Sequence, residues 1–167
     1  RAVHSDPTEL PIQLRDLPSM RVARLAYQGA PEAIGEAFEQ ATRFAIDEGV
    51  GPCGPLIGCY PSLAPAPDSI RAEVLVPLTR LPDAAPEGIE LLRLAGFHAV
   101  CLLYRGPMDP GFRKVHLELF AWMDSRGIPR DGTRHQHAYV AGTDPESDWT
   151  IEIRVPVLAG RRPLRAL

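Results

Sequence analysis

Strict alternation of apolar and polar residues marks a strand near the carboxyl end of this chain, at 149–156. Its apolar side chains fall on one face: Trp149, Ile151, Ile153 and Val155. Pro156 ends the segment because proline cannot donate a hydrogen bond to a neighbouring strand. The segment 70–76 has a similar pattern and also carries a glutamate four residues before a closing proline. The same strand, written twice, predicts a duplicated fold and draws attention to Glu152.

Positions 77 residues apart support the duplication. Between 12–29 and 89–106, six of eighteen positions are identical, where about one would be expected by chance. The identical residues of the first copy are Ile12, Leu14, Leu17, Leu25, Tyr27 and Gly29. We therefore expect a single domain spanning 1–167, with repeats at about 12–78 and 89–157 and a connector at 81–88.

Each repeat reads as two strands, a helix and two further strands. The first copy predicts strands at 12–17, 20–27, 57–60 and 70–76, and the second copy repeats the first two and adds 135–140 and 149–156. Proline-containing loops are expected at 61–68 and around Asp144, and a frayed basic tail at 161–167. Because this order lacks a regular βαβ alternation, it favours an α+β fold, with an antiparallel sheet and two helices on one face.

Apolar stripes at helical spacing identify the two helices. The first helix opens at Pro31 and ends at Gly49, and its stripe is Ile34, Ala37, Phe38, Ala41, Phe44 and Ala45. The second opens at Asp109-Pro110 and ends at Gly127, and its stripe is Phe112, Val115, Leu119, Trp122 and Met123. The apolar faces of 70–76 and 149–156 are expected to pack on these helices, and the opposite faces to line a cleft between the two halves.

Composition excludes several functions. A net charge of -3 leaves no long basic surface for nucleic-acid phosphates, so a DNA-binding role for this chain alone is disfavoured. Three cysteines without metal-type spacing fit a reducing cytosol, and neither a signal peptide nor a membrane-spanning stretch is evident. These features predict a cytoplasmic protein without membrane partners.

One predicted strand carries candidate chemistry. His135, His137 and Tyr139 share one face of it, and Ala138 and Val140 share the other. If the small residues face the core, His137 and Tyr139 join Glu152 on the cleft side. The plainer interpretation is a solvated sheet face, on which Glu152 pairs with a neighbouring cation.

A metal site is a weaker hypothesis. His135, His137 and Glu152 would supply two imidazoles and a carboxylate, but the spacing indicates no further strong ligand, so we expect no metal and no other cofactor. His98 and His116 are expected to be surface or half-buried residues. The chain lacks a phosphate-binding loop and a nucleophile elbow, and Cys59 and Cys101 are expected to be buried packing thiols.

Several short segments together resemble the GyrI-like small-molecule-binding domain, also called the AraC-type effector-binding domain. They are Ala26-Tyr27-Gln28-Gly29, Leu103-Tyr104-Arg105-Gly106, Pro55-Leu56-Ile57-Gly58-Cys59-Tyr60 and Ile151-Glu152-Ile153-Arg154-Val155-Pro156. Each is weak alone, but their order and spacing over about 12–157 are fairly specific. The resemblance implies two β-α-β-β units related by a pseudo-two-fold axis, with a ligand pocket between them.

The resemblance also implies the site residues. The family's central pocket acid corresponds to Glu152, and its aromatic walls to Tyr60, Tyr139, Trp122 and Tyr104. A buried carboxylate among aromatic rings suits a lipophilic cation. Trp122 fits core packing as well as ligand contact.

Two details modify this picture. His137 stands where the family often has an acid, which weakens the case for a dicationic ligand. Glu73, the repeat mate of Glu152, is expected to approach it across the pseudo-dyad.

We therefore expect a non-catalytic domain that binds amphipathic or cationic organic molecules. It would act as the effector half of an AraC- or MerR-type regulator, with a DNA-binding domain outside this chain, or as a stand-alone drug-binding protein. The alternative is a hydrolase of strained, cyclopropane-bearing compounds, in which Glu152 activates water and Tyr139 donates a proton.

Overall fold

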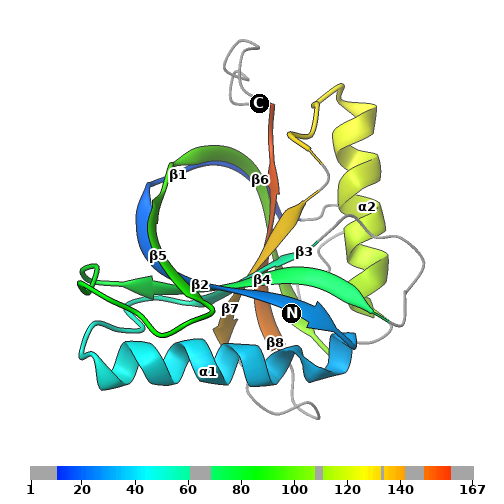
Figure 1. The fold of residues 1–167 in the computed structure, drawn as a ribbon. Coiled ribbons are helices and arrows are strands. Elements are labelled where there is room, and N and C mark those ends of the chain that lie inside the picture. The colour runs from blue at the N-terminus through cyan, green and yellow to red at the C-terminus, as the bar shows by residue number, and fades with distance from the viewer. Residues whose placement is uncertain (1–10, 61–68, 108–110, 133, 142–148, 159–167) are drawn as a thin grey trace, which may run out of the picture.

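Eight antiparallel strands form one sheet, and two α-helices pack on it (Figure 1). The computed structural model describes residues 11–60, 69–107, 111–132, 134–141 and 149–158. The strands are β1 (Ile12–Leu17), β2 (Met20–Gly29), β3 (Leu56–Tyr60), β4 (Ile70–Leu78), β5 (Ile89–Leu94), β6 (Phe97–Gly106), β7 (His135–Ala141) and β8 (Trp149–Pro156). The helices are η1 (Pro31–Ala33), α1 (Ile34–Asp47) and α2 (Gly111–Ser125). The predicted α+β fold is confirmed.

Most predicted boundaries hold to within two residues. Pro31 lies in the first turn of η1, which leads directly into α1, and Gly49 follows the helix with a positive φ of 65°. The predicted loops at 61–68 and around Asp144, the cap at Asp109-Pro110 and the tail at 161–167 lie outside the described residues.

The strand order has two-fold symmetry. It reads β1-β6-β8-β7-β3-β4-β2-β5, and replacing each strand by the one four places away in the chain gives the same order reversed. The symmetry axis therefore passes between β3 and β7, which pair from Leu56–Tyr139 to Tyr60–His135. This is the symmetry that the 77-residue repeat predicts.

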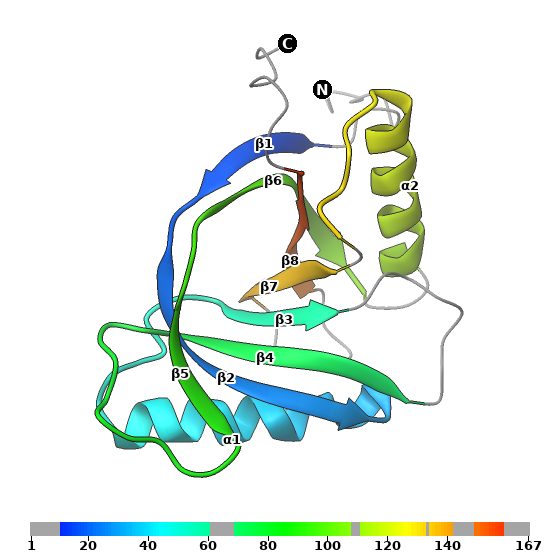
Figure 2. The same ribbon diagram turned by 45° about the horizontal axis from the view of Figure 1, so that its top comes forward.

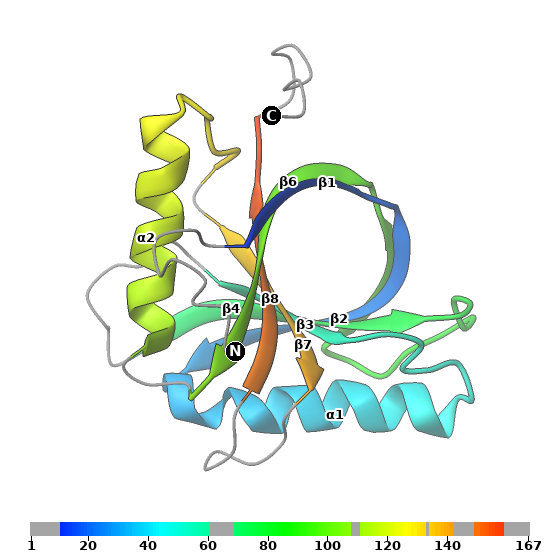
Figure 3. The same ribbon diagram turned by 180° about the vertical axis from the view of Figure 1, so that it is seen from behind.

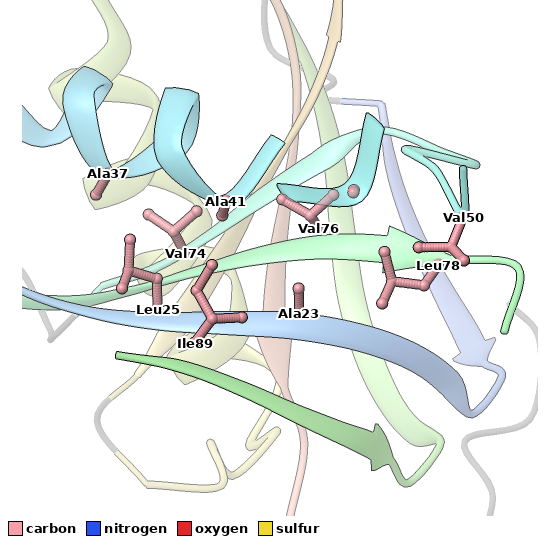
Figure 4. Packing of buried hydrophobic residues seen from close by; sticks show 10 residues of the cluster. Ala23, Leu25, Ala37, Ala41, Val50, Val74, Val76, Leu78 and Ile89 are labelled. Carbon is pink, nitrogen blue, oxygen red and sulfur yellow. The ribbon is translucent and has the colours of Figure 1, made fainter. Parts of the chain in front are cut away.

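Both helices cover the same face of the sheet, as their apolar stripes predict. Ala37, Ala41 and Ala45 of α1 pack against a cluster that includes Val74 and Val76 of β4 (Figure 4). Leu119 and Met123 of α2 pack against Ile151 and Ile153 of β8. Each repeat thus has its own helix-covered core, whose burial is the main source of its stability.

The other face of the sheet curls on itself. β1 runs almost directly into β2, and β5 into β6, although each pair joins opposite regions of the sheet. Seen in Figure 1, from the tilted view of Figure 2 and from behind in Figure 3, these strands arch away from the helices into a ring. Two small clusters fill this side, one around Val22, Ile57 and Leu75 and one around Leu17 and Cys101.

A tyrosine folds over the glycine two residues later at the end of both β2 and β6. Tyr27 donates a hydrogen bond to the carbonyl of Ala30, and Tyr104 donates one to the carbonyl of Pro107. A Cβ on Gly106 would lie 2.8 Å from the Tyr104 hydroxyl oxygen, so only glycine leaves room for the ring. This explains why the tyrosine and the glycine are identical in both repeats.

The cysteines are free thiols, and Cys59 and Cys101 are buried, as predicted. Burial raises the pKa of each to about 11, so both stay protonated and unreactive at neutral pH. No helix in the described part of the chain is long and apolar enough to cross a bilayer.

Replacing Gly106 with alanine is expected to lower the free energy of unfolding by about 1–3 kcal/mol. The new methyl group would meet the Tyr104 hydroxyl, and the backbone at φ 151° disfavours a side chain. Urea denaturation followed by tryptophan fluorescence measures the change. Gly35→Ala is the control, since its Cβ would have no neighbour within 4 Å and should stabilise α1 by about 0.5–1 kcal/mol. An equal effect of both substitutions would contradict the proposed role of the Tyr104 ring.

Candidate functional site

The pairing of β3 with β7 brings aromatic and imidazole rings together at the symmetry axis. Tyr60 is the cross-strand partner of His135, and Gly58 is the partner of His137. A Cβ on Gly58 would lie 2.5 Å from atoms of the Tyr60 ring, so glycine here allows that ring to lie across the strand. As a result the Tyr60 and His137 rings are 4.5 Å apart, centroid to centroid.

Two tyrosines share a hydrogen bond within this cluster. The hydroxyl oxygens of Tyr60 and Tyr139 are 2.5 Å apart, with one phenol donating to the other. Burial raises the pKa of Tyr60 to about 12 and holds that of Tyr139 well above its usual 10, so both remain neutral at physiological pH. Phe38 of α1 and Trp149 of β8 pack edge-on against Tyr139 at 5.5 and 6.0 Å. The predicted aromatic walls Tyr60 and Tyr139 therefore do lie together.

Three histidines complete the cluster. His135 and His137 project from β7 on the side that faces α2, where His116 meets them. Their exposed fractions are 2%, 6% and 1%, respectively. The prediction that His116 is a surface or half-buried residue is wrong. It stands four residues after Phe112 and three before Leu119, so it belongs to the buried stripe of the helix, and that spacing could have revealed it.

Burial keeps these imidazoles neutral. It lowers the pKa of all three histidines below the usual 6.5, that of His135 to about 4, and mutual repulsion adds to the effect for His135 and His137. Their closest ring nitrogens all lie within 4.8 Å of one another. Neutral imidazole is the form that binds transition metals, so this is where the described part of the chain could hold a metal ion.

Glu152 lies on the opposite face of the sheet from these rings. Its partner on β7 is Ala138, so Ala138 shares its face, while His137 and Tyr139 point to the other side. The predicted common cleft of Glu152, His137 and Tyr139 is therefore wrong, and so is the metal set that combined Glu152 with His135 and His137. The predicted cleft required Ala138 and Val140 to face the helix-covered core, whereas His137 and Tyr139 take that position.

Glu152 already has two cationic partners. Its carboxylate oxygens lie 2.6 Å from Nη1 of Arg15 and 2.6 Å from Nε of Arg154, and the Glu152 and Arg154 side chains are 16% and 13% exposed. Glu73 pairs instead with Arg134 at 3.4 Å. Because β3 and β7 separate their strands, Glu73 and Glu152 lie roughly 14 Å apart, so the expected approach across the pseudo-dyad does not occur.

Trp122 and Tyr104 belong to the core beneath α2 and are not part of the Tyr60–Tyr139 pair. Trp122 packs at the edge of the α2 core, with the Arg126 guanidinium 4.2 Å from its ring centroid. Tyr104 is a buried member of the same core and contacts Phe112. Phe112 connects Tyr104 with the cluster, since its ring lies 4.9 Å from that of His137.

A groove of about 420 Å³ lies beside α1. Its apolar walls are Phe38, Ile46 and Leu56, and its charged rim is Glu39, Arg43 and Asp47. Phe38 contacts Tyr139 directly, and Leu56 is the cross-strand partner of Tyr139. A second groove of about 470 Å³ lies between α1 and the start of β5, beside Phe44, Pro86 and Ile89. Neither groove was evident from the sequence, because each depends on how α1 sits against the sheet.

Replacing Glu152 with glutamine is expected to reduce the free energy of unfolding by about 1–3 kcal/mol, because it leaves the mostly buried Arg154 without its counter-charge. Glu90→Gln is the control, since Glu90 forms a similar pair with Arg24 but is 59% exposed and should cost about 0–1 kcal/mol. Chemical denaturation of both variants gives the comparison. A smaller loss for Glu152→Gln than for Glu90→Gln would contradict this role of the carboxylate.

Acid is expected to destabilise the protein through the three histidines. Since their folded-state pKa values lie below the unfolded value of 6.5, the unfolded chain binds more protons as pH falls. Their stabilising contribution is complete above about pH 6.5 and is lost toward pH 4, at up to about 1.4 kcal/mol per pH unit for each histidine. Urea denaturation between pH 7 and 5, with EDTA present, measures the slope. His135→Gln should flatten it, and an unchanged slope would contradict the assignment.

Comparisons with known proteins identify the fold. No match was found among curated proteins. The crystal structure of the EcmrR C-terminal domain has 15% identity and a TM-score of 0.77, with 89% of this chain and 98% of that chain covered. EcmrR in a complex with DNA aligns with a TM-score of 0.72 at 14% identity over 87% of this chain, and the alignment spans only 56% of that EcmrR chain.

Two further structures share the fold. A hydrolase from Listeria innocua has 16% identity and a TM-score of 0.63, with 88% of this chain and 91% of that chain covered. SAV2435 bound to tetraphenylphosphonium has 13% identity and a TM-score of 0.59, with 90% and 95% covered. The family model described as GyrI-like small molecule binding domain matches residues 10–158. The chain therefore belongs to the GyrI-like small-molecule-binding domain family.

Proposed function

We propose that this domain binds a small amphipathic organic cation in the groove beside α1 that Phe38 and Leu56 line. The observation that carries the proposal is that two residues lining the groove adjoin the aromatic cluster: Phe38 packs against Tyr139, and Leu56 is the cross-strand partner of Tyr139. A volume of about 420 Å³ falls within the usual range for small-molecule sites. Family membership supports the general function, and the groove supports a location.

The chemistry of the groove suits a lipophilic cation. Phe38, Ile46 and Leu56 offer apolar surface for a hydrophobic body, and the Phe38 ring offers its face to a positive charge. At the rim, Arg43 pairs with Glu39 at 3.0 Å, which leaves the charge of Asp47 to favour a cation. The hydroxyl of Thr42 is buried in the groove wall without a hydrogen-bond partner among the described residues. One of the similar structures, SAV2435, was solved bound to tetraphenylphosphonium, a ligand of this class.

The opposite face of the sheet supports cation binding less well. Glu152 was the expected anchor, but Arg15 and Arg154 already neutralise it, and a cationic ligand would have to displace one of them. The hydrolase alternative meets a related difficulty. Glu152 and Tyr139 lie on opposite faces of the sheet, so they could not act together on one bond.

The match with the EcmrR C-terminal domain supports a regulatory role. This chain aligns with 98% of that domain and with 56% of EcmrR in the DNA complex. We propose that the domain senses its ligand as the effector-binding part of a transcription regulator, with any DNA contacts made by another domain. A stand-alone drug-binding protein would use the same site.

Calorimetric titration with tetraphenylphosphonium tests the site. We expect binding by the wild type and an affinity at least about tenfold lower in Phe38→Ala, since that substitution removes one apolar wall and its aromatic face. Phe44→Ala is the matched control, because Phe44 lies on the same helix, is also partly buried, and lines the other groove. Unchanged affinity in Phe38→Ala, or an equal loss in Phe44→Ala, would contradict the proposed location. A selective loss in Glu152→Gln would move the site to the opposite face.

A further inference from the structure

We propose that His116, His135 and His137 form a binding site for a divalent transition metal of the Zn²⁺ class. The site lies between α2 and β7, on the helix-covered side of the sheet. It is separate from the groove proposed for the organic ligand, since the ring of Tyr139 lies between Phe38 of that groove and His137.

Local geometry brings the three rings to one point. A spacing of two residues on β7 directs His135 and His137 to the same face, and α2 places His116 over them. The ring centroids are 4.8 Å apart for His135–His137, 4.8 Å for His116–His137 and 5.1 Å for His116–His135. The three rings therefore form a nearly equilateral triangle.

Hydrogen bonding orients two of the rings. Nδ1 of His116 lies 2.7 Å from the carbonyl oxygen of Phe112, to which it donates a hydrogen bond, and this leaves the Nε2 lone pair of His116 directed at the cluster. A backbone carbonyl that holds the far nitrogen of a metal-binding histidine is a common outer-shell feature of such sites. Nε2 of His116 and Nε2 of His137 face each other at 2.7 Å. Without a metal, one of these two atoms must carry a proton.

Hydrogen bonding does not account for the buried position of the His135 ring. Both of its ring nitrogens are buried and lack a partner among the residues that the structure describes. A neutral imidazole still carries one N–H donor and one acceptor, and leaving such a group unsatisfied in a protein interior costs about 1–3 kcal/mol. Coordination of a metal by one nitrogen would compensate part of this cost. A purely structural histidine cluster would leave this cost uncompensated.

The distances are close to those of a metal site. The closest nitrogens of the three histidines lie within 4.8 Å of one another, whereas tetrahedral zinc with bonds of about 2.0–2.1 Å places its ligands about 3.3 Å apart. Binding would therefore separate the His116 and His137 nitrogens by about half an ångström and draw His135 inward. Small rotations of the rings about their side-chain bonds supply shifts of this size.

The ligand set selects the class of metal. Imidazoles favour zinc, copper, nickel and cobalt over calcium and magnesium, which prefer oxygen ligands. The low pKa values of the three histidines keep each ring neutral at neutral pH, so each ring has one unprotonated nitrogen that can bind a metal. Three protein ligands leave one tetrahedral position for water or an external ligand. Among the described residues, the rings in contact with the histidines are those of Tyr60, Phe112, Phe120 and Tyr139. Because these rings are uncharged at neutral pH, they would not neutralise the positive charge of the metal.

Cobalt is a direct probe of this site. The untagged, EDTA-treated chain is titrated with Co²⁺ and then Zn²⁺, at pH 7.5, with visible absorption and calorimetry as readouts. We expect one equivalent to bind, with the intense visible bands of tetrahedral Co²⁺, and Zn²⁺ to displace it. His135→Gln and His116→Gln should each lower the affinity by about tenfold or more. His98→Gln, which alters an exposed histidine paired with Asp16, should leave the affinity unchanged.

The variants must be shown to fold, by circular dichroism, before their affinities are compared. A measurement on the wild type avoids this requirement, because X-ray absorption at the zinc edge should report three imidazole nitrogens at about 2.0 Å. The proposal is overturned if the wild type binds no metal, if the bound zinc lacks imidazole ligands, or if folded His135→Gln and His116→Gln retain wild-type affinity.

Discussion

The antiparallel pairing of β3 with β7 is the constraint on which the rest of the structure depends. It is the direct strand contact between the inner strands of the two repeats, and it makes one continuous sheet from two half-sheets. Its register also decides which side chains meet at the symmetry axis. With Gly58 opposite His137 and Tyr60 opposite His135, the aromatic and imidazole rings are placed on the side that the helices cover. A shift of one residue would send all of them to the other face.

The two faces of the sheet consequently have different chemistry. The helix-covered face carries neutral rings in a nearly dry environment, where burial suppresses the charge of every histidine and tyrosine in the cluster. The opposite face carries arginine–glutamate pairs above a thin apolar layer, with Glu152 between Arg15 and Arg154 and Glu73 beside Arg134. The lipophilic ligand that we propose would therefore bind on the face opposite the network of ion pairs.

Much of the fold could be predicted from the sequence because its signals are local and repeated. The alternation of apolar and polar residues predicted the strands, and the apolar stripes predicted the helices. Tyr27 and Tyr104, each followed by a glycine, indicated the repeat. The orientation of β7 could not be predicted in this way. Ala138 and Val140 look like core residues beside His137 and Tyr139. In the structure, however, the His137 ring is buried and the Tyr139 ring partly buried under the helices, and Val140 is exposed. Likewise His116 lies within a helix stripe, but recognising its partners requires the approach of α2 to β7.

The continuity of β1 with β2 and of β5 with β6 has a consequence for the order of folding. Ile12 in β1 pairs with Leu102 in β6, and β2 pairs with β5 as well as with β4. When the first repeat leaves the ribosome, the strands that pair with β1 and with one edge of β2 have therefore not yet been synthesised. Contacts between such distant residues are costly in chain entropy and slow to form. We therefore expect the two halves to complete their strand pairing together, rather than one half folding first as a template for the other.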